Sequence, residues 1–380
     1  MFTFFYKDLV QVGGAERYLF DFFHSLKETH KVKIICFSYS SEVLKFFNIK
    51  INDIVVIEGE NFFSKLLNLR TYINKTDTKI ICHSGSIDCY LSLIFTKKRY
   101  DVILHHPHFN SFISLDIFSI FYSKYRDQFI DDSFVHDELF KIQKQLDFKN
   151  KIKLNIRAII QFFAIKKSDK IFVLTQYAYQ EKLKLFKKKS IVLPSPISKA
   201  FSKNTKNIKI TGISNNQNSI LFAGRLIKEK RVDLLIKLYK RYNSTLPKLK
   251  IIGSGDQFEY LNNEINSNNL NIELLGRLDD DELLLKIKEA SLFITLEWAD
   301  FNLTVYESIY LGTPVIFGKY CLVEEHDLRY IKDKMLFYTD PNIDSIYNTI
   351  NKVMSNNFKR KKYKLNYNWD MFINNFLTNY

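Results

Sequence analysis

Short apolar runs alternate with longer segments of helical spacing along nearly the whole chain. In the first half the apolar runs predict strands at 2–6, 32–38, 53–57, 79–83, 101–105, 170–174 and 190–194. Between them, segments such as 14–30 (GAERYLFDFFHSLKETH) repeat their apolar residues with the period of a helix. Strands that alternate with helices predict parallel sheets joined by crossover helices.

A polar stretch separates the two halves of the chain. Residues 197–218 are rich in Asn, Lys and Ser and weakly patterned, so we interpret them as a linker. Strands then resume at 219–224, 249–253, 272–276, 291–296 and 314–317. The pattern predicts an α/β protein of two doubly wound, Rossmann-like domains that face each other across a cleft. A ligand is expected in that crevice, at the carboxyl ends of the strands.

Residues 109–165 do not follow this rhythm. They mix Phe, Ile and Tyr with Lys and Arg, and two interpretations stay open. The segment is either a core-facing helix pair or an amphipathic surface for a lipid or an anionic acceptor. The run 182–190 (KLKLFKKKS) would add a basic face nearby, although a solvated helix end explains it equally well.

The charge balance is strongly basic. The 380 residues include 56 Lys+Arg against 41 Asp+Glu, a formal net charge of +15. Such an excess suits nucleic acid, an anionic membrane face or phosphate-bearing small molecules, and an AT-rich genome would explain much of it as well. We find no RRM, helix-turn-helix or zinc signature, so nucleic acid is not the expected partner.

The cysteines and the apolar segments indicate the cellular compartment in which the protein is expected. Cys36, Cys82, Cys89 and Cys321 lack any metal-ligand spacing, and two of them lie in strand-like runs, so we expect core thiols in a reducing cytoplasm. The N-terminus has no basic lead and is not expected to be a signal peptide. No uncharged run reaches the roughly 18–20 residues of a membrane-spanning helix. A soluble or peripheral protein is expected.

Two loops carry candidate chemistry for a phosphate. Gly13 and Gly14 precede a predicted helix, where backbone N–H groups could approach a phosphate or a sugar hydroxyl; a plain tight turn is the alternative. In 222–236, Gly224 ends a strand and is followed by Arg225 and Lys230. Two cations beyond a strand's carboxyl end could bind a diphosphate, although solvated surface charge would give the same pattern.

A third candidate lies at the start of a later helix. After the loop ending at Asn302, the helix expected to begin near Leu303 and Thr304 would present N–H groups to the same diphosphate. Glu307, one turn further, could accept hydrogen bonds from a ribose diol, or be only an exposed helix carboxylate. Gly312 and the proline after it are expected to end this helix.

In this order the motifs resemble the retaining glycosyltransferases of family 4 (group 1), which have the GT-B fold. VGGAER (12–17) looks like the family's N-domain glycine loop, and GRLIKEK like its Arg and Lys donor-phosphate motif. IIGSGD, with Gly253, and the segment with Arg277 and Leu278 look like its following turn and base-binding unit. ADFNLTVYESIYLGTPVIF resembles the segment with two glutamates eight positions apart. The last residues resemble the family's C-terminal helix, which crosses back to the N-domain.

The resemblance implies a role for every candidate residue. It divides the chain into an acceptor-binding domain (1–197), a nucleotide-sugar donor domain (198–365) and a crossover helix (366–380). Arg225, Lys230, Glu307 and a histidine after an N-domain strand, for which His105 matches best, are the implied catalytic residues. The implied donor-binding residues are Gly13, Gly14, Gly224, Gly253, Arg277, Leu278, Asn302, Leu303 and Thr304.

The sequence also departs from the family pattern. Ala299 stands where the first acid of the pair would fall, although Glu297 or Asp300 could reach the same volume. Asn302 stands where a glycine is usual, and Arg231 where a glycine is common. A metal site formed by His105, His106 and His108 lacks acidic or cysteine companions and is not expected.

The predicted function is retaining transfer of a sugar from a nucleotide-diphosphate sugar to an acceptor hydroxyl, without a metal or other cofactor. The expected partners are the nucleotide sugar, a carbohydrate or lipid-linked acceptor and, peripherally, an anionic membrane at its cytoplasmic face, as in polysaccharide or lipopolysaccharide assembly. A nucleotide-sugar epimerase of the same fold and a catalytically weakened nucleotide-sugar binder are the alternatives. An NAD-dependent dehydrogenase is disfavoured because no complete G-x-G-x-x-G follows either first strand.

Overall fold

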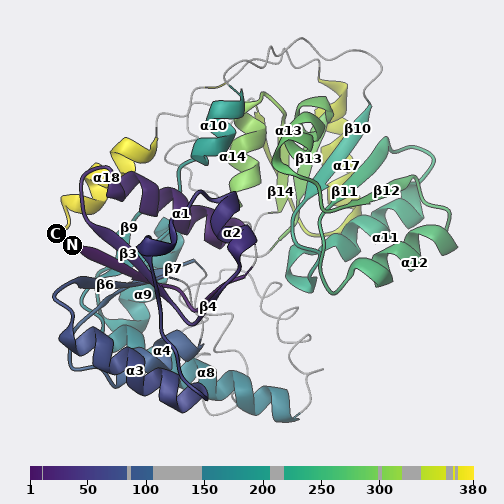
Figure 1. The fold of residues 1–380 in the computed structure, drawn as a ribbon. Coiled ribbons are helices and arrows are strands. Elements are labelled where there is room, and N and C mark those ends of the chain that lie inside the picture. Colours follow the sequence, from purple (N-terminus) through teal and green to yellow (C-terminus); the bar gives the residue numbers. More distant parts are fainter. Residues whose placement is uncertain are drawn as a thin grey trace. The chain divides into compact units, whose positions relative to one another are not determined.

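The computed structural model describes residues 1–10, 12–83, 87–105, 148–205, 218–297, 302–318, 335–356, 363 and 367–380. The chain forms two compact units (Figure 1). Unit 1 is Met1–Pro196 together with Trp369–Tyr380, and unit 2 is Ile197–Asn368. Each unit is an α/β layer structure around one parallel sheet, as the alternation of strands and helices predicts.

The sheet of unit 1 has the strand order β5-β3-β1-β6-β7-β8-β9 and is parallel throughout. Its strands are β1 (Phe2–Phe5), β3 (Val32–Cys36), β5 (Ile54–Val56), β6 (Lys79–His83), β7 (Asp101–Leu104), β8 (Ile171–Val173) and β9 (Ile191–Val192). All strands predicted for the first half are present. A small separate pair, β2 (Asp8–Leu9) with β4 (Ser38–Tyr39), was not predicted, because two residues are too short to show alternation.

Helices cover both faces of this sheet. On one face, α3 (Phe62–Lys75), α4 (Ile87–Ile94), α8 (Phe148–Lys167) and α9 (Gln176–Phe186) share a hydrophobic cluster with the strands. On the other face α1 (Gly14–Lys27) packs against the C-terminal helix α18 (Trp369–Leu377). There the Phe22 ring meets Phe372 and Phe376 edge-on, at 4.8 and 4.7 Å between centroids. The predicted return of the last helix to the first domain is confirmed.

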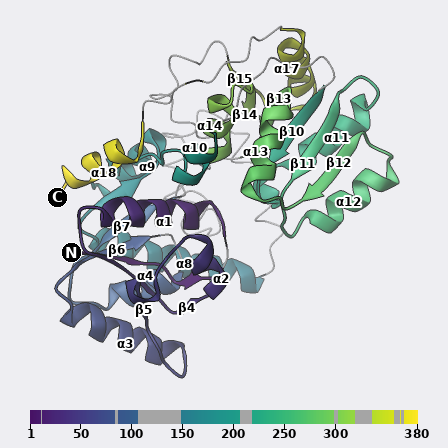
Figure 2. The ribbon, with the colours of Figure 1, turned by 45° about the horizontal axis from the view of Figure 1, so that its top comes forward.

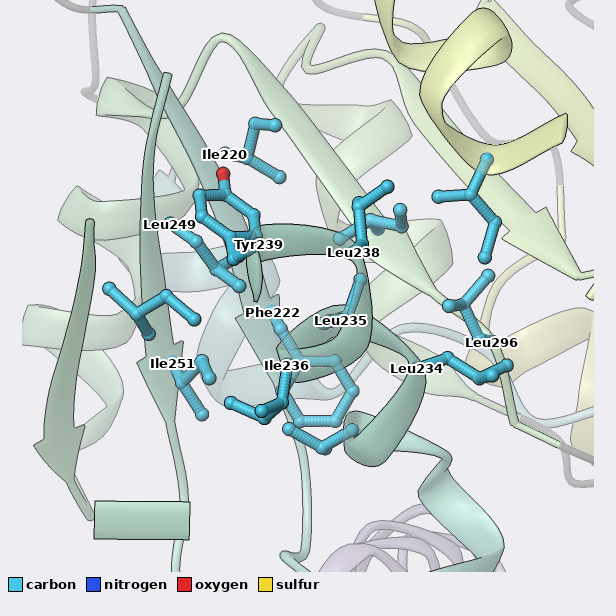
Figure 3. Close-up of a cluster of buried hydrophobic side chains, with 14 of the residues drawn as sticks. Ile220, Phe222, Leu234, Leu235, Ile236, Leu238, Tyr239, Leu249, Ile251 and Leu296 are labelled. Carbon is cyan, nitrogen blue, oxygen red and sulfur yellow. The ribbon is translucent and has the colours of Figure 1, made fainter. Parts of the chain in front are cut away.

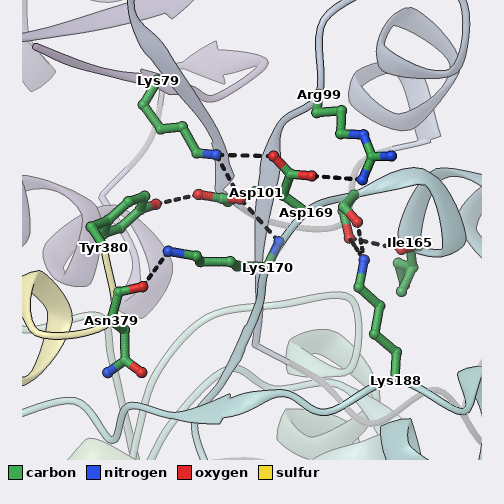
Figure 4. A network of polar contacts seen from close by, with 10 residues as sticks. Lys79, Arg99, Asp101, Ile165, Asp169, Lys170, Lys188, Asn379 and Tyr380 are labelled. Atoms are coloured by element: carbon green, nitrogen blue, oxygen red, sulfur yellow. Dashed lines mark hydrogen bonds and ion pairs between the residues drawn. The ribbon is translucent and has the colours of Figure 1, made fainter.

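A polar network fixes the C-terminus to unit 1 (Figure 4). Tyr380 Oη donates to the buried carboxylate of Asp101, and the Lys170 backbone N–H donates to the same carboxylate at 3.0 Å. Lys79 Nζ lies 3.5 Å from it. Burial raises the pKa of Asp101, and these hydrogen bonds and the nearby lysines partly offset the effect. The Lys170 ammonium lies 3.9 Å from the centre of the Tyr380 ring.

The sheet of unit 2 has the order β12-β11-β10-β13-β14-β15 and is also parallel. Its strands are β10 (Ser219–Ala223), β11 (Lys248–Ile252), β12 (Ile272–Gly276), β13 (Leu292–Thr295), β14 (Val315–Gly318) and β15 (Leu336–Thr339). The sequence predicted all of these except β15. That edge strand buries only its two end residues, so it lacks the continuous apolar run of the central strands.

Two apolar clusters hold the layers of unit 2 together. On one face α11 (Val232–Tyr242), α12 (Phe258–Ser267) and α17 (Ile343–Ser355) pack on the strands (Figures 2 and 3). On the other face lie α13 (Asp280–Glu289), α14 (Leu303–Tyr310) and the short α10 (Lys199–Thr205). Figure 3 shows Leu235 and Leu238 of α11 in this first cluster, together with Phe222 of β10.

Two sequence interpretations change in detail. The predicted linker 197–218 is wrong over its first part, because α10 lies there and Phe201 packs against Tyr310, with ring centroids 5.9 Å apart. Polar composition hid this helix, since Thr205 is the one buried residue among its seven. The segment 109–165 contains the N-terminal part of α8, and its residues 109–147 lie outside the described residues, as does Cys321. Cys36, Cys82 and Cys89 are buried thiols outside any disulfide.

Among the described residues, no helix combines the length and apolarity that a membrane crossing requires. The described helices also include α2 (Ser41–Phe46) and two single-turn 3₁₀ helices, η1 (Ile51–Asp53) and η2 (Lys228–Lys230).

Candidate functional site

The predicted donor-site residues of unit 2 follow strands of one parallel sheet and therefore lie along its carboxyl edge. Gly224 and Arg225 follow β10, and Lys230 ends η2 in the same connection. Further residues follow β11, β12 and β13; they are Gly253, Arg277, Leu278, Asn302, Leu303 and Thr304. Because β10 lies between β11 and β13, the loops after these three strands are neighbours. Carboxyl edges of parallel sheets are where such folds bind ligands.

Gly253 is required by the packing of two of these loops. Its φ is +146°, and a Cβ there would lie 1.9 Å from the carbonyl oxygen of Gly224. The loops are also joined by hydrogen bonds: Gly224 N donates to Ile252 O at 3.0 Å, and Leu226 N donates to Ser254 O at 2.9 Å. The neighbouring loop makes this close approach, so the packing of the two loops is enough to require a glycine here.

A buried ion pair lies at the centre of this edge. Lys230 Nζ donates to Glu297 Oε2, two residues past the end of β13. The side chain of Glu297 is 0% exposed and that of Lys230 is 10% exposed. A lysine in such surroundings keeps its charge only with a paired carboxylate. Glu297 therefore anchors the ammonium group that the sequence assigns to the donor phosphates.

The two arginines of this connection differ in environment. Arg225 is exposed, and its side chain makes no hydrogen bond or ion pair to any residue that the structure describes. Arg231 is buried and lies in the left-handed region, with φ +56° and ψ +34°. Its Nε donates to Asp233 Oδ1 at 3.4 Å. The left-handed backbone gives the physical reason why a glycine is common at this position.

The N-terminus of α14 is already capped. Asn302 Oδ1 accepts a hydrogen bond from Thr304 N at 2.9 Å, and Asn302 O accepts one from Val305 N at 3.2 Å. Asn is among the best N-cap residues, which accounts for its presence where the family has glycine. Two of the N–H groups predicted for the diphosphate are thus occupied within the helix. Glu307 lies one turn on and is half-buried, and Gly312, with φ +76°, follows the end of the helix as predicted.

In unit 1 the predicted glycine loop lies beside a buried carboxylate, that of Glu16. Gly13 is the N-cap of α1 and Gly14 its first residue. Glu16 is buried, and Tyr6, just past β1, donates its hydroxyl to Glu16 Oε1 at 2.6 Å. A Cβ on Gly13 would lie 2.6 Å from Glu16 Oε2. The sequence reasoning missed Tyr6 and Glu16, although an acid in the first turn after paired glycines was a usable signal.

Two histidines meet at the carboxyl edge of the unit 1 sheet. His83 ends β6 and His105 follows β7, and their Nε2 atoms are 3.2 Å apart, so one ring donates to the other. The Tyr18 ring lies 5.3 Å from His83 and 5.1 Å from His105, between centroids. Burial, and then the nearby His105, hold the pKa of His83 well below its usual value. His83 is therefore neutral at physiological pH, and its Nδ1 has no hydrogen-bonding partner among the described residues.

Some predicted positions are not part of this picture. His106, His108, Ala299 and Asp300 lie outside the described residues. Within the described residues, no group of three or more His, Cys, Asp or Glu side chains could hold a metal ion.

Two parallel α/β units, with a C-terminal helix that returns to the first, define the GT-B fold of glycosyltransferases. Residues 203–368, which make up most of unit 2, match the family model of glycosyl transferases group 1. An uncharacterized glycosyltransferase of Methanocaldococcus jannaschii is 28% identical over 178 residues. That match spans 42% of this chain and 43%, less than half, of the archaeal protein.

Solved structures share the fold at low sequence identity. The apo lipopolysaccharide outer core galactosyltransferase WaaB is 15% identical with a TM-score of 0.59, and the match covers 99% of this chain and 94% of WaaB. Anabaena HepE in complex with UDP-glucose is 14% identical with a TM-score of 0.62, covering 93% and 90% of the two chains. WaaG, involved in lipopolysaccharide biosynthesis, is 13% identical with a TM-score of 0.61, covering 94% and 91%.

Proposed function

We propose that the protein is a retaining family 4 glycosyltransferase that moves a hexosyl or similar sugar from a nucleotide-diphosphate sugar to an acceptor hydroxyl. The observation that carries the proposal is the carboxyl edge of unit 2, where Arg225 and the Glu297-anchored Lys230 stand beside the loops after β11 and β13. This unit is the part of the chain that matches the group 1 family model.

In the proposed reaction the cations act on the leaving group. Arg225 and Lys230 would stabilise the negative charge that develops on the nucleoside diphosphate, an effect that typically lowers a barrier by several kcal/mol. With two cations in this role the reaction needs no divalent metal ion. Glu307, one turn into α14, would accept hydrogen bonds from the ribose.

Unit 1 would bind the acceptor and would also contribute a histidine to the reacting sugar. His105 is proposed to hydrogen-bond the donor sugar, and His83 fixes the orientation of its ring through the contact between the Nε2 atoms. WaaB is a lipopolysaccharide outer core galactosyltransferase and WaaG is involved in lipopolysaccharide biosynthesis. Together with the net charge of +15, these similarities support an acceptor in polysaccharide or lipopolysaccharide assembly, handled at the cytoplasmic face of an anionic membrane.

The first test is a screen of nucleotide sugars for thermal stabilisation, followed by transfer assays with the best donor. Glu307→Ala should remove most of the stabilisation, whereas Glu259→Ala, at an exposed position of α12, should leave it unchanged. NMR of the product should show the donor's anomeric configuration, and a chelator should leave the rate unaltered. Inverted product, or equal stabilisation of wild type and Glu307→Ala, would refute the corresponding part of the proposal.

One alternative has a specific observation in its favour. Ala299 replaces the family's first acid, which favours a weakened enzyme that binds donor without transferring it. Stabilisation by a donor without transfer to any acceptor would support that alternative. Incubation of the protein with donor alone tests the epimerase alternative, because an epimerase would yield an isomerised nucleotide sugar without any acceptor.

A further inference from the structure

The helix α8 has an unusual charge composition. Its 20 residues, Phe148–Lys167, include six basic residues and no acidic one, although the chain as a whole contains 41 Asp+Glu. The basic residues are Lys149, Lys151, Lys153, Arg157, Lys166 and Lys167. The helix therefore carries a local positive charge with no acidic neighbour along its own length.

An apolar stripe runs along the exposed face of α8. Ile152, Ile156, Ile159 and Phe163 are 42%, 50%, 38% and 55% exposed. Their spacing of four, three and four residues places them on one side of the helix. Single exposed apolar residues are ordinary, but a contiguous row of them marks a contact surface.

The opposite face of α8 is the one used by the fold. Ala164 and Ile165 are buried in a hydrophobic cluster that also contains residues of α4. Figure 1 shows α8 running beside α4. Lys167 Nζ donates to Ile94 O at 2.6 Å, at the end of α4. The helix is thus held in place by one face, and the stripe does not contribute to the core of unit 1.

Basic residues close both ends of the stripe. Lys149 is three residues before Ile152, and Lys166 is three residues after Phe163, so both continue the same side of the helix, and both are exposed. We propose that this face of α8 is a docking surface for an anionic lipid bilayer, with the helix lying in the interface plane. The apolar side chains would enter the acyl boundary while the lysines contact the headgroups.

Charge favours a bilayer over a second copy of the chain. Two α8 stripes brought together would place lysines of one copy against those of the other, on proteins that each carry +15. An anionic surface instead attracts each basic residue near it. This docking surface would make the membrane contact that the proposed function includes. The evidence for it comes from α8 alone, and its test needs neither donor nor acceptor.

The test is flotation of the full-length chain with phosphatidylcholine vesicles that contain or lack phosphatidylglycerol. Wild type should float with the anionic vesicles and far less with neutral ones. The double variant Ile156→Ser with Phe163→Ser should reduce the partition coefficient at least tenfold. A matched control, Tyr260→Ser with Leu285→Ser, alters two similarly exposed apolar residues on α12 and α13, and should float as wild type does.

A second variant separates charge from apolar contact. Lys149→Glu with Lys166→Glu should weaken binding and reduce its dependence on salt. Equal flotation of wild type and the Ile156/Phe163 variant would overturn the proposal, provided that both unfold at the same temperature. A dimer in solution that the Ile156→Ser, Phe163→Ser variant abolishes and the matched control does not would also overturn it, because the stripe would then be an interface between two copies. Nucleotide-sugar stabilisation of the same variant should be unchanged, which keeps this outcome distinct from failure of the proposed function.

Discussion

The buried pair Lys230–Glu297 makes a prediction that depends on unit 2 alone. Glu297→Leu would leave the ammonium of a nearly buried lysine without its carboxylate. Breaking a buried pair from one side typically costs about 3–5 kcal/mol, because the remaining charge stays desolvated. We therefore expect the free energy of unfolding of unit 2 to fall by about that amount.

The thermal effect follows from the size of the unit. For a domain of roughly 150–250 residues, 1 kcal/mol corresponds to about 2–4 °C in Tm. Glu297→Leu should therefore lower the transition of unit 2 by roughly 6–20 °C. Glu297→Gln keeps an acceptor oxygen for Lys230 Nζ and should cost less, about 1.5–3 kcal/mol, the range for a hydrogen bond to a charged group.

A double-mutant cycle isolates the pair. Lys230→Met combined with Glu297→Leu replaces both charges by apolar groups, which is often nearly neutral. The double variant should therefore be more stable than Glu297→Leu. The coupling energy from urea denaturation should be at least about 3 kcal/mol, because the cost of Glu297→Leu is largely recovered in the double variant. Lys237→Ala, an exposed lysine on α11, serves as the control and should change stability by less than about 0.5 kcal/mol. Additive effects of the two changes would show that the pair does not form.

Three further predictions concern single sites. Since the pKa of His83 is lowered on folding, the unfolded chain binds the extra proton below about pH 6.5, and stability should fall there by up to about 1.4 kcal/mol per pH unit. His83→Gln should flatten that slope in denaturation curves, and an unchanged slope would show that His83 is not buried and neutral. Gly253→Ala should lower the free energy of unfolding by at least about 1–3 kcal/mol, because its positive φ strains any residue with a Cβ. Gly14→Ala, with open space around it, should be neutral or stabilising, and equal effects of the two changes would contradict the loop packing. Tyr380→Phe removes a hydrogen bond to buried Asp101 and should lower the free energy of unfolding by about 1.5–3 kcal/mol. The same change at exposed Tyr260 should lower it by less than about 0.5 kcal/mol. Equal costs would show that the network does not anchor the C-terminus.

Most of the fold could be predicted from the sequence because its strands are buried on both sides. Central strands such as β1 and β10 read as short continuous apolar runs, and the crossover helices between them show the helical period. The strands that escaped prediction, β2, β4 and β15, are very short or half-exposed. The linker interpretation failed at α10 for a related reason, since a short polar helix offers little periodicity.

The candidate site was predicted less completely, because its organisation depends on contacts between distant residues. Sequence motifs identify Arg225, Lys230 and Glu307 but do not show that Glu297, 67 positions from Lys230, is the carboxylate paired with it. Nor do they show that Gly253 serves the neighbouring loop. The roles of the predicted site residues in donor binding stay predictions.

We propose that a nucleoside diphosphate binds at the carboxyl edge of unit 2, against Arg225 and Lys230. Calorimetric titration with the best nucleotide sugar, applied to wild type, Arg225→Ala and the control Lys237→Ala, measures this binding itself. Arg225→Ala should weaken binding at least tenfold, while Lys237→Ala should bind as wild type does. Equal affinities for all three proteins would contradict it.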